Sequence, residues 1–471
     1  MLTNKNLYYR YIYCIIAVVK NLLSQLKKQS VLVQFLAIGW LVLIILLPFH
    51  AFISTWGGTT IGPLNLWKAW KEILLSLLVF AVIIQSFVDK DMFRYFWKSW
   101  ITRLIVIFGL LHLLIAIIIG NQSSPLAFGL AINLRIVSMF LVGGVVFYYI
   151  RPDKKELIRL LLIPAGLVIL LGLLQMFILP YNLLSHFGYK EGVTIAPFNT
   201  IDQQIDQLRI MSTLRGPNPL GAYLILPGVL LLGLIISVAE RFKIESSKKS
   251  FKLAIGLSAL LAGLLIVLYG SHSRSAWLGF VVSAGVYLIV KLSTKWRLVL
   301  VSIGLLGVVI GSFGLYQLRD TSFVQNVILH DNPEVGPEQT SNSDHTLAIK
   351  NALSDIKQNP LTGCAPGCAG PASFYDPDGA KLSENYYLQI AQEVGVVGLG
   401  LFIAINVLVG IQLFKKRQDA LALALLASLI GIIVANLLLH VWADDTLAYI
   451  WWGIAGAVLA KKYIADRETR S

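Results

Sequence analysis

Long apolar runs recur from Val31 to Ala460, and they constrain the fold of this chain more than any other feature. A helix of about 20 apolar residues spans the roughly 30 Å hydrocarbon core of a bilayer. The composition agrees, because 56% of the 471 residues are hydrophobic and 14% are charged, whereas soluble domains average about 25% charged residues. The sequence therefore predicts an all-α integral membrane protein with about twelve transmembrane helices and one long outer loop that contains a short helix.

The hydropathy pattern predicts membrane helices at 31–50, 68–88, 101–119, 128–150, 157–179, 217–238, 252–270, 275–291, 297–316, 385–414, 419–440 and 442–460. The same pattern divides the chain into a cytoplasmic basic segment (1–30), helices one to nine (31–316), a long extracytoplasmic loop (317–384), helices ten to twelve (385–460) and a cytoplasmic tail (461–471). Within the first segment, we expect residues 8–28 to form a basic amphipathic helix on the inner surface.

The basic residues predict the orientation. With both termini inside, 28 of the 39 Lys and Arg residues lie in the termini and the short loops on the cytoplasmic side. Cytoplasmic loops of membrane proteins carry such an excess. The net charge of +14 is thereby explained by topology, and the sequence predicts no nucleic-acid partner.

Three segments on the opposite side look unlike simple connectors: 51–67, 180–216 and the long loop 317–384. The long loop contains one predicted helix, which Ser343 or Asp344 can cap and Pro360 ends. It also carries Cys364 and Cys368 in the sequence GCAPGC, where a disulfide and two free thiols are both open alternatives. A zinc site would need more ligands than this loop supplies, and no Asp-x-Asp pair argues strongly for a bound divalent metal. We expect no metal and no cofactor.

Two arginines stand beside predicted helix starts on the outer side. Arg274, in SHSRSAWLG, directly follows an apolar run, and Arg215, in STLRGPNPLG, precedes a Pro-Asn-Pro turn. An arginine beside a helix N-terminus is well placed to bind an anion. The alternative for Arg274 is an interfacial arginine that reaches toward lipid headgroups, and for Arg215 a plain interfacial turn.

Acidic and buried polar residues complete the set. Glu384 and Asn385 stand at the entrance of a helix, in LSENYYLQIAQEVGVVGLGLF, where an acid can also simply complement the helix dipole. Arg135 lies inside an apolar run, either as a functional residue or as one half of a structural ion pair. Asp444 and Asp445 lie at a predicted outer junction, where they can also be solvated helix ends.

Together, Arg215, Arg274, Glu384 and Lys71 fall on one side of the membrane. Three cations and a carboxylate predict a pocket for an anion with a base beside it. This combination suits the transfer of a group away from a phosphate leaving group.

The motifs RGPNPLG, SRSAWLG, QNPLTGCAPG and ENYYLQIAQEVGVVGLGLF resemble the O-antigen ligase and O-antigen polymerase family. The resemblance covers roughly residues 200–410 by motif and the remainder by topology. It implies a metal-independent, inverting membrane glycosyltransferase. Such an enzyme transfers a glycan from an undecaprenyl pyrophosphate carrier to a lipid, a growing glycan or a protein, at the outer face of the bacterial plasma membrane.

The resemblance also implies roles for single residues. Arg274 matches the arginine of the SRS motif and Arg215 the arginine of the turn, so both are expected to bind pyrophosphate, as is Lys71. Glu384 stands where ligases have a histidine before Asn385, and a carboxylate can serve as the general base. His345 stands where ligases often carry an arginine, and these two departures weaken the case for lipid A core as the acceptor.

Two other functions stay open from the sequence. A transporter or flippase of lipid-linked sugars or small solutes would share the predicted topology, although the two halves of the chain show no matching lengths. A structural membrane scaffold would leave the outer arginines without a role. As partners, the enzyme hypothesis names the lipid-linked donor, a glycan, lipid or protein acceptor, and membrane lipids.

Overall fold

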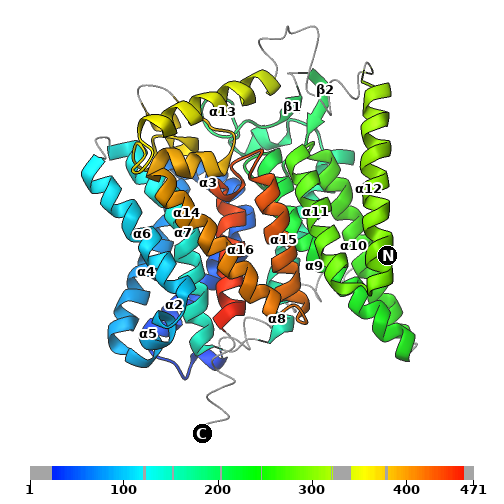
Figure 1. The fold of residues 1–471 in the computed structure, drawn as a ribbon, viewed down its shortest axis with the longest axis horizontal. Coiled ribbons are helices and arrows are strands. Elements are labelled where there is room, and N and C mark those ends of the chain that lie inside the picture. Colours follow the sequence, from blue (N-terminus) through cyan, green and yellow to red (C-terminus); the bar gives the residue numbers. More distant parts are fainter. Residues whose placement is uncertain are drawn as a thin grey trace.

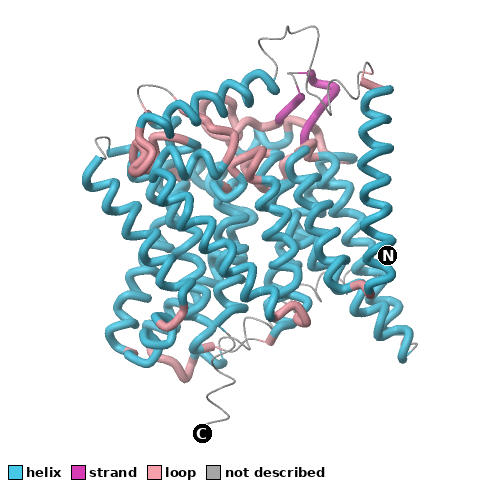
Figure 2. The backbone as a smooth tube through the Cα atoms, in the orientation of Figure 1, coloured by secondary structure: helices cyan, strands magenta, loops and turns pink. Residues whose placement is uncertain are grey.

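The computed structural model describes residues 24–119, 123–150, 153–201, 204–245, 247–319, 321, 341–376 and 380–460. These residues form a bundle of helices (Figure 1). The longer loops and the two strands gather at one end of the bundle (Figure 2), which we call the loop-bearing end. The predicted amphipathic helix at 8–28 lies almost entirely outside the described residues, as does the tail 461–471.

The helices are α2 (Val31–Leu46), α3 (His50–Thr60), α4 (Leu64–Val88), α5 (Lys90–Trp97), α6 (Trp100–Ile119), α7 (Ser123–Tyr149), α8 (Lys154–Phe177), α9 (Pro217–Glu245), α10 (Lys248–Gly270), α11 (Arg274–Lys291), α12 (Thr294–Gln317), α13 (Ser341–Gln358), α14 (Tyr386–Lys415), α15 (Ala420–Ala435) and α16 (Asp445–Ala460). Short 3-10 turns are η1 (Leu47–Phe49), η2 (Leu183–Phe187), η4 (Gly370–Tyr375) and η5 (Val441–Ala443). The strands β1 (Asn199–Ile201) and β2 (Gln204–Arg209) form one antiparallel hairpin.

Within the described residues, ten helices are long and apolar enough to cross a membrane, with α2, η1 and α3 counted as one. This confirms the all-α multi-pass fold. Two further apolar helices, α15 and α16, have 16 residues each. The total of twelve spans stays a prediction.

Helix α16 occupies the centre of the bundle (Figure 1), and nearly all of its residues are buried. Its closest neighbour is α7, and small residues bring the two backbones together. A Cβ atom added at Gly143 would lie 2.1 Å from the carbonyl oxygen of Gly453, and one at Gly456 would lie 2.1 Å from that of Phe140. Such small-residue contacts replace the hydrophobic driving force that apolar lipid cannot supply.

The first predicted outer loop is largely helical, so its boundaries were wrong. The helix pauses at the turn Leu47–Phe49 and resumes as α3, which runs to Thr60, and α4 begins at Leu64. Pro48 falls at the start of the turn, where its missing N–H costs little. The polar and glycine-rich composition of α3 is typical of a loop. In the structure the segment is a helix, and its polar residues His50, Ser54 and Thr55 are buried.

The long loop contains its predicted helix, α13, which begins at Ser341 and so before the expected caps. Leu347 and Leu353 lie on its exposed side, and Ala352 is the residue buried against the bundle. Cys364 and Cys368 form a disulfide, which resolves the two alternatives that the sequence left open.

Candidate functional site

Three strained turns carry the predicted site residues at the loop-bearing end. In the described part of the chain, four non-glycine residues have positive φ: Ser212, His272, Ala365 and Glu384. A residue in this region costs of order 1–3 kcal/mol and persists only where its surroundings impose it. One of the four is Glu384 itself, and two others lie within three residues of Arg215 and Arg274.

The turn before α9 is fixed from beneath by α8. Ser212 donates its backbone N–H to the side chain of Gln175 at 2.7 Å and its hydroxyl to the carbonyl oxygen of Val168 at 2.7 Å. This holds the chain in place as it enters α9, so that the Nε of Arg215 lies 3.1 Å from a carboxylate oxygen of Asp444. The Arg215 side chain is still 42% exposed, so part of the guanidinium stays open to a ligand.

The entrance to α14 is fixed by Asn385, which caps the helix. Its side-chain oxygen accepts hydrogen bonds from the N–H groups of Tyr387 and Leu388, at 2.9 and 3.1 Å. Its side-chain nitrogen donates to the carbonyl oxygen of Leu437, past the end of α15, at 3.1 Å. Asn385 therefore holds the adjacent Glu384 in position and is occupied with backbone contacts.

A cavity of about 380 Å³ opens between these elements. Its walls include Arg215, Asn218, Glu384, His440 and Asp444. The structure thus brings together two predicted site residues, Arg215 and Glu384, which lie 169 positions apart in the sequence. Small-molecule sites have volumes of roughly 300–1,000 Å³ and a few convergent polar groups, and this cavity meets both conditions.

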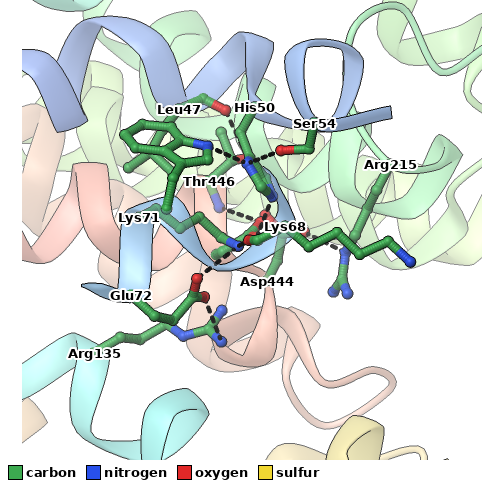
Figure 3. Close-up of polar contacts among 12 residues, drawn as sticks. Leu47, His50, Ser54, Lys68, Lys71, Glu72, Arg135, Arg215, Asp444 and Thr446 are labelled. Carbon is green, nitrogen blue, oxygen red and sulfur yellow. Dashed lines mark hydrogen bonds and ion pairs between the residues drawn. The ribbon is translucent and has the colours of Figure 1, made fainter. Parts of the chain in front are cut away.

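Behind the cavity lies an enclosed cluster of charged side chains at the N-terminal end of α16 (Figure 3). Lys71 lies 3.2 Å from Asp445 and 3.0 Å from Glu72. Asp445 also pairs with the Nε2 of His50 at 3.5 Å, and Glu72 lies 3.9 Å from Arg135. Lys71, Arg135 and Asp445 are each less than 10% exposed, so each charge is balanced by a partner and not by water.

Two of these cations had been predicted as site residues, and their contacts are now defined. The ammonium group of Lys71 meets two carboxylates. The guanidinium group of Arg135 also donates to the carbonyl oxygen of Ala443 at 3.2 Å and lies 5.7 Å from the ring of Tyr449. Both side chains therefore make their contacts inside the protein.

Arg274 lies beside a second arginine that the sequence reasoning did not select. Arg209, the last residue of β2, donates to the carbonyl oxygen of Ser271 at 3.1 Å and to the side-chain oxygen of Asn218 at 2.8 Å. Burial and the neighbouring charge of Arg274 lower the pKa of Arg209 to about 10. Arg209 is therefore cationic at neutral pH, and its contact with Asn218 links it to the cavity wall.

The hairpin sequence alone gives no signal for Arg209, because it lies in a polar loop at no recognised helix start. The carboxylates Glu72, Asp444 and Asp445 were also missed as cluster members. The sequence does hold an indication of each. Glu72 directly follows Lys71. Asp444 and Asp445 stand at the start of an apolar helix of only 16 residues, so both carboxylates lie close to the apolar interior.

The turn that holds the disulfide is anchored on a fully buried acid. Glu393 accepts a hydrogen bond from the backbone N–H of Gly367 at 2.9 Å, and its other oxygen accepts from the side chain of Asn133. Its backbone oxygen accepts from the N–H of Ala365 at 3.1 Å. These contacts fix the loop against α7 and α14, next to the cavity.

One predicted residue stays undefined: His345 lies on α13, and its side chain is outside the described residues. Within the part of the chain that the structure describes, no group of three or more His, Cys, Asp and Glu residues is arranged to hold a metal ion.

Residues 258–403 match the family model described as O-antigen ligase. This segment is therefore similar to the O-antigen ligase family. The matched segment contains Arg274, the disulfide, Glu384 and Glu393, whereas Lys71 and Arg215 lie outside it. A comparison with curated proteins gives no match. The apolar helices indicate a membrane-embedded protein, and one segment of it is similar to O-antigen ligases.

Proposed function

We propose that the chain is a membrane glycosyltransferase of the O-antigen ligase or polymerase type. It transfers a glycan from undecaprenyl pyrophosphate to a surface polysaccharide, a lipid or a protein. The reaction proceeds without a metal ion and with inversion at the anomeric carbon. The loop-bearing end faces outward from the bacterial plasma membrane, and both termini lie in the cytoplasm.

One observation carries this proposal: Glu384 and Arg215 line the same cavity. A carboxylate that is to act as a base must lie where the acceptor hydroxyl can reach it, and a cation must lie where negative charge develops on the leaving group. The strained backbone of Glu384 supports the assignment, because such strain is found mostly where function requires it.

The proposed step is a single displacement. The oxygen of the acceptor hydroxyl forms a bond to the anomeric carbon of the donor sugar, on the face opposite the carrier. The bond between that carbon and the pyrophosphate oxygen breaks, and its electron pair leaves with undecaprenyl pyrophosphate. Glu384 takes the hydroxyl proton, while Arg215 and Arg274 neutralise the charge that develops on the pyrophosphate.

The contacts support positioning roles for three of the predicted residues. Because Lys71 already meets two carboxylates, we propose that it positions Asp445 and does not itself contact the pyrophosphate. Arg135 likewise acts as a positioning residue between α4, α7 and α16. Asn385 positions Glu384 through the helix cap.

The packing beneath the cluster favours an enzyme over a transporter. Trp442, Trp451, Trp452 and Tyr449 are each fully buried around the central helix. Transporters bind their substrates near the middle of the membrane, at broken helices. Here bulky aromatic side chains pack around the central helix, while the cavity and the charged cluster lie at its N-terminal end.

The test is glycan transfer by the purified protein from an undecaprenyl-pyrophosphate-linked donor, with and without EDTA, beside Arg274→Ala. We expect product that survives EDTA and that falls about 10²- to 10³-fold in the variant, the usual cost of a lost contact to transition-state charge. The length of the product separates a polymerase from a ligase. Equal activity of the variant would refute the anion site, and loss of activity in EDTA would refute the metal-independent mechanism.

A further inference from the structure

A second cavity, of about 440 Å³, lies under α13. Its walls are formed by α13, the segment 380–382 and Gln392 of α14. Leu382 lines this cavity and also the one that holds Arg215 and Glu384. The two cavities therefore meet at one side chain, two residues before the proposed base.

Gln392 shows that the second cavity is built for a polar ligand. This residue is 3% exposed, and its side-chain nitrogen donates to the carboxylate of Asp355 at 2.9 Å. Since a carboxylate accepts hydrogen bonds, this contact fixes which side of the amide carries the oxygen. That oxygen has no hydrogen-bond partner among the described residues. A buried acceptor left unsatisfied in this way costs about 1–3 kcal/mol, which a ligand hydroxyl would recover once the amide turns toward the cavity that Gln392 lines.

The chemistry of the walls differs from that of the first cavity. Asn351, Ser354 and Gln392 offer neutral donors and acceptors, and Asp355 and Lys381 supply one charge of each sign. Leu347, Ala348, Ala352 and Leu382 add apolar surface. A carboxylate next to the amide disfavours pyrophosphate, whereas a sugar ring presents both hydroxyl groups and apolar C–H faces.

We propose that the second cavity binds a sugar of the acceptor glycan. The inference rests on the proposed function, because it assigns the acceptor to one side of Leu382 and the carrier phosphate to the other. A sugar held under α13 would direct its next hydroxyl past Leu382 toward Glu384. The acceptor thus enters from the side of α13, and the donor enters from the side of Arg215 and Arg274.

The experiment uses the full-length protein in nanodiscs and the double variant Asn351→Ala/Ser354→Ala. Both residues lie on the accessible side of α13, so the fold is retained. The matched control is Lys350→Ala/Lys357→Ala, which changes two exposed residues of the same helix that do not line the cavity. The probes are oligosaccharides released by mild acid from the surface polymer of the producing bacterium. Their binding is measured by saturation-transfer NMR without donor.

We expect oligosaccharide binding to weaken roughly tenfold in the cavity variant, for two lost hydrogen bonds, and to be unchanged in the control. In the transfer assay, the acceptor KM rises by the same factor while the donor KM stays constant. Gln392→Met provides a second cavity variant, expected to weaken binding in the same direction.

Equal binding by the wild type and both cavity variants would overturn the inference. A rise in the donor KM alone would also overturn it, by assigning the cavity to the donor glycan. If the wild type binds oligosaccharide and transfers nothing from any donor, the proposed function fails while the glycan site stands.

Discussion

Two groups of cations lie at the same end of this bundle, and they are held in different ways. In the enclosed cluster, Lys71 and Arg135 are buried and lie within 4 Å of carboxylates. At the other group, Arg209 lies beside Arg274, and its hydrogen-bond partners among the described residues are two neutral oxygens. The cations of the first group are paired with carboxylates, whereas in the second group two arginines lie side by side and Arg209 contacts Asn218 of the cavity wall.

This difference indicates a structural role for the enclosed cluster and a ligand-binding role for the arginine pair. A buried charge is tolerated when a partner of opposite sign offsets the cost of removing it from water. Two neighbouring arginines repel each other, and this repulsion is relieved when an anion binds between them. The enclosed cluster therefore holds α4, α7 and α16 together, and the arginine pair is suited to a phosphate group. Arg215 belongs to both, since it pairs with Asp444 and also faces the cavity.

The largest expected effect comes from the cavity side. Glu384→Gln keeps the shape of the side chain and removes its basicity, so we expect transfer to fall about 10²- to 10⁴-fold. The melting temperature in detergent should stay close to that of the wild type. The matched control is Glu191→Gln, an exposed acid in another loop of the same end. Full activity in Glu384→Gln would remove this residue as the base.

In the enclosed cluster, removal of a carboxylate should lower the stability of the protein. Asp445→Leu leaves Lys71 and His50 without their shared carboxylate partner. Breaking a buried pair on one side costs about 3–5 kcal/mol, so we expect a clear fall in melting temperature and in the yield of folded protein. Thermal unfolding in detergent, followed by tryptophan fluorescence, measures the change.

The double variant Lys71→Met/Asp445→Leu turns this into a sharper test. Replacing both partners of a buried pair by apolar residues is often neutral or stabilising, so the double variant should recover most of the lost stability. If Lys71 only positions Asp445, activity should recover in part together with stability. Recovery of stability with activity still absent would instead return Lys71 to direct contact with the pyrophosphate.

The sequence predicts the helical membrane fold and two of the residues that line the cavity, Arg215 and Glu384, for physical reasons. Membrane helices are set by the length of apolar runs, which can be counted without knowledge of packing. The site prediction for Arg215, Arg274 and Glu384 rests on a local feature, since each stands at a helix entrance. By contrast, the sequence predicts a loop where α3 forms, because burial of the polar face of this helix depends on partners distant in the sequence.

The pairing of charges was the part that the sequence did not reveal. Lys71 and Asp445 lie 374 positions apart, and their contact depends on α16 standing in the centre of the bundle. Arg209 was missed for the same reason, since only the hairpin β1–β2 brings it to Arg274. Which cations were already neutralised could therefore be learned only from the fold.

The smallest expected effect is that of Arg209→Gln on stability. It tests the comparison most directly, because the substitution should raise the stability of the ligand-free protein and reduce the stabilisation by pyrophosphate. Arg209→Gln removes one of two neighbouring positive charges, so the ligand-free protein should become slightly more stable. With inorganic pyrophosphate present, the wild type should gain more stability than the variant, and transfer by the variant should fall roughly tenfold, as for one charge-assisted hydrogen bond. Melting temperatures over a pyrophosphate titration measure both the stability without ligand and the stabilisation by pyrophosphate. The control is Lys190→Gln, which removes an exposed cation at the same end. A variant less stable without ligand, and equally stabilised by pyrophosphate, would place Arg209 with the structural cations of the enclosed cluster and leave the anion site to Arg274 and Arg215.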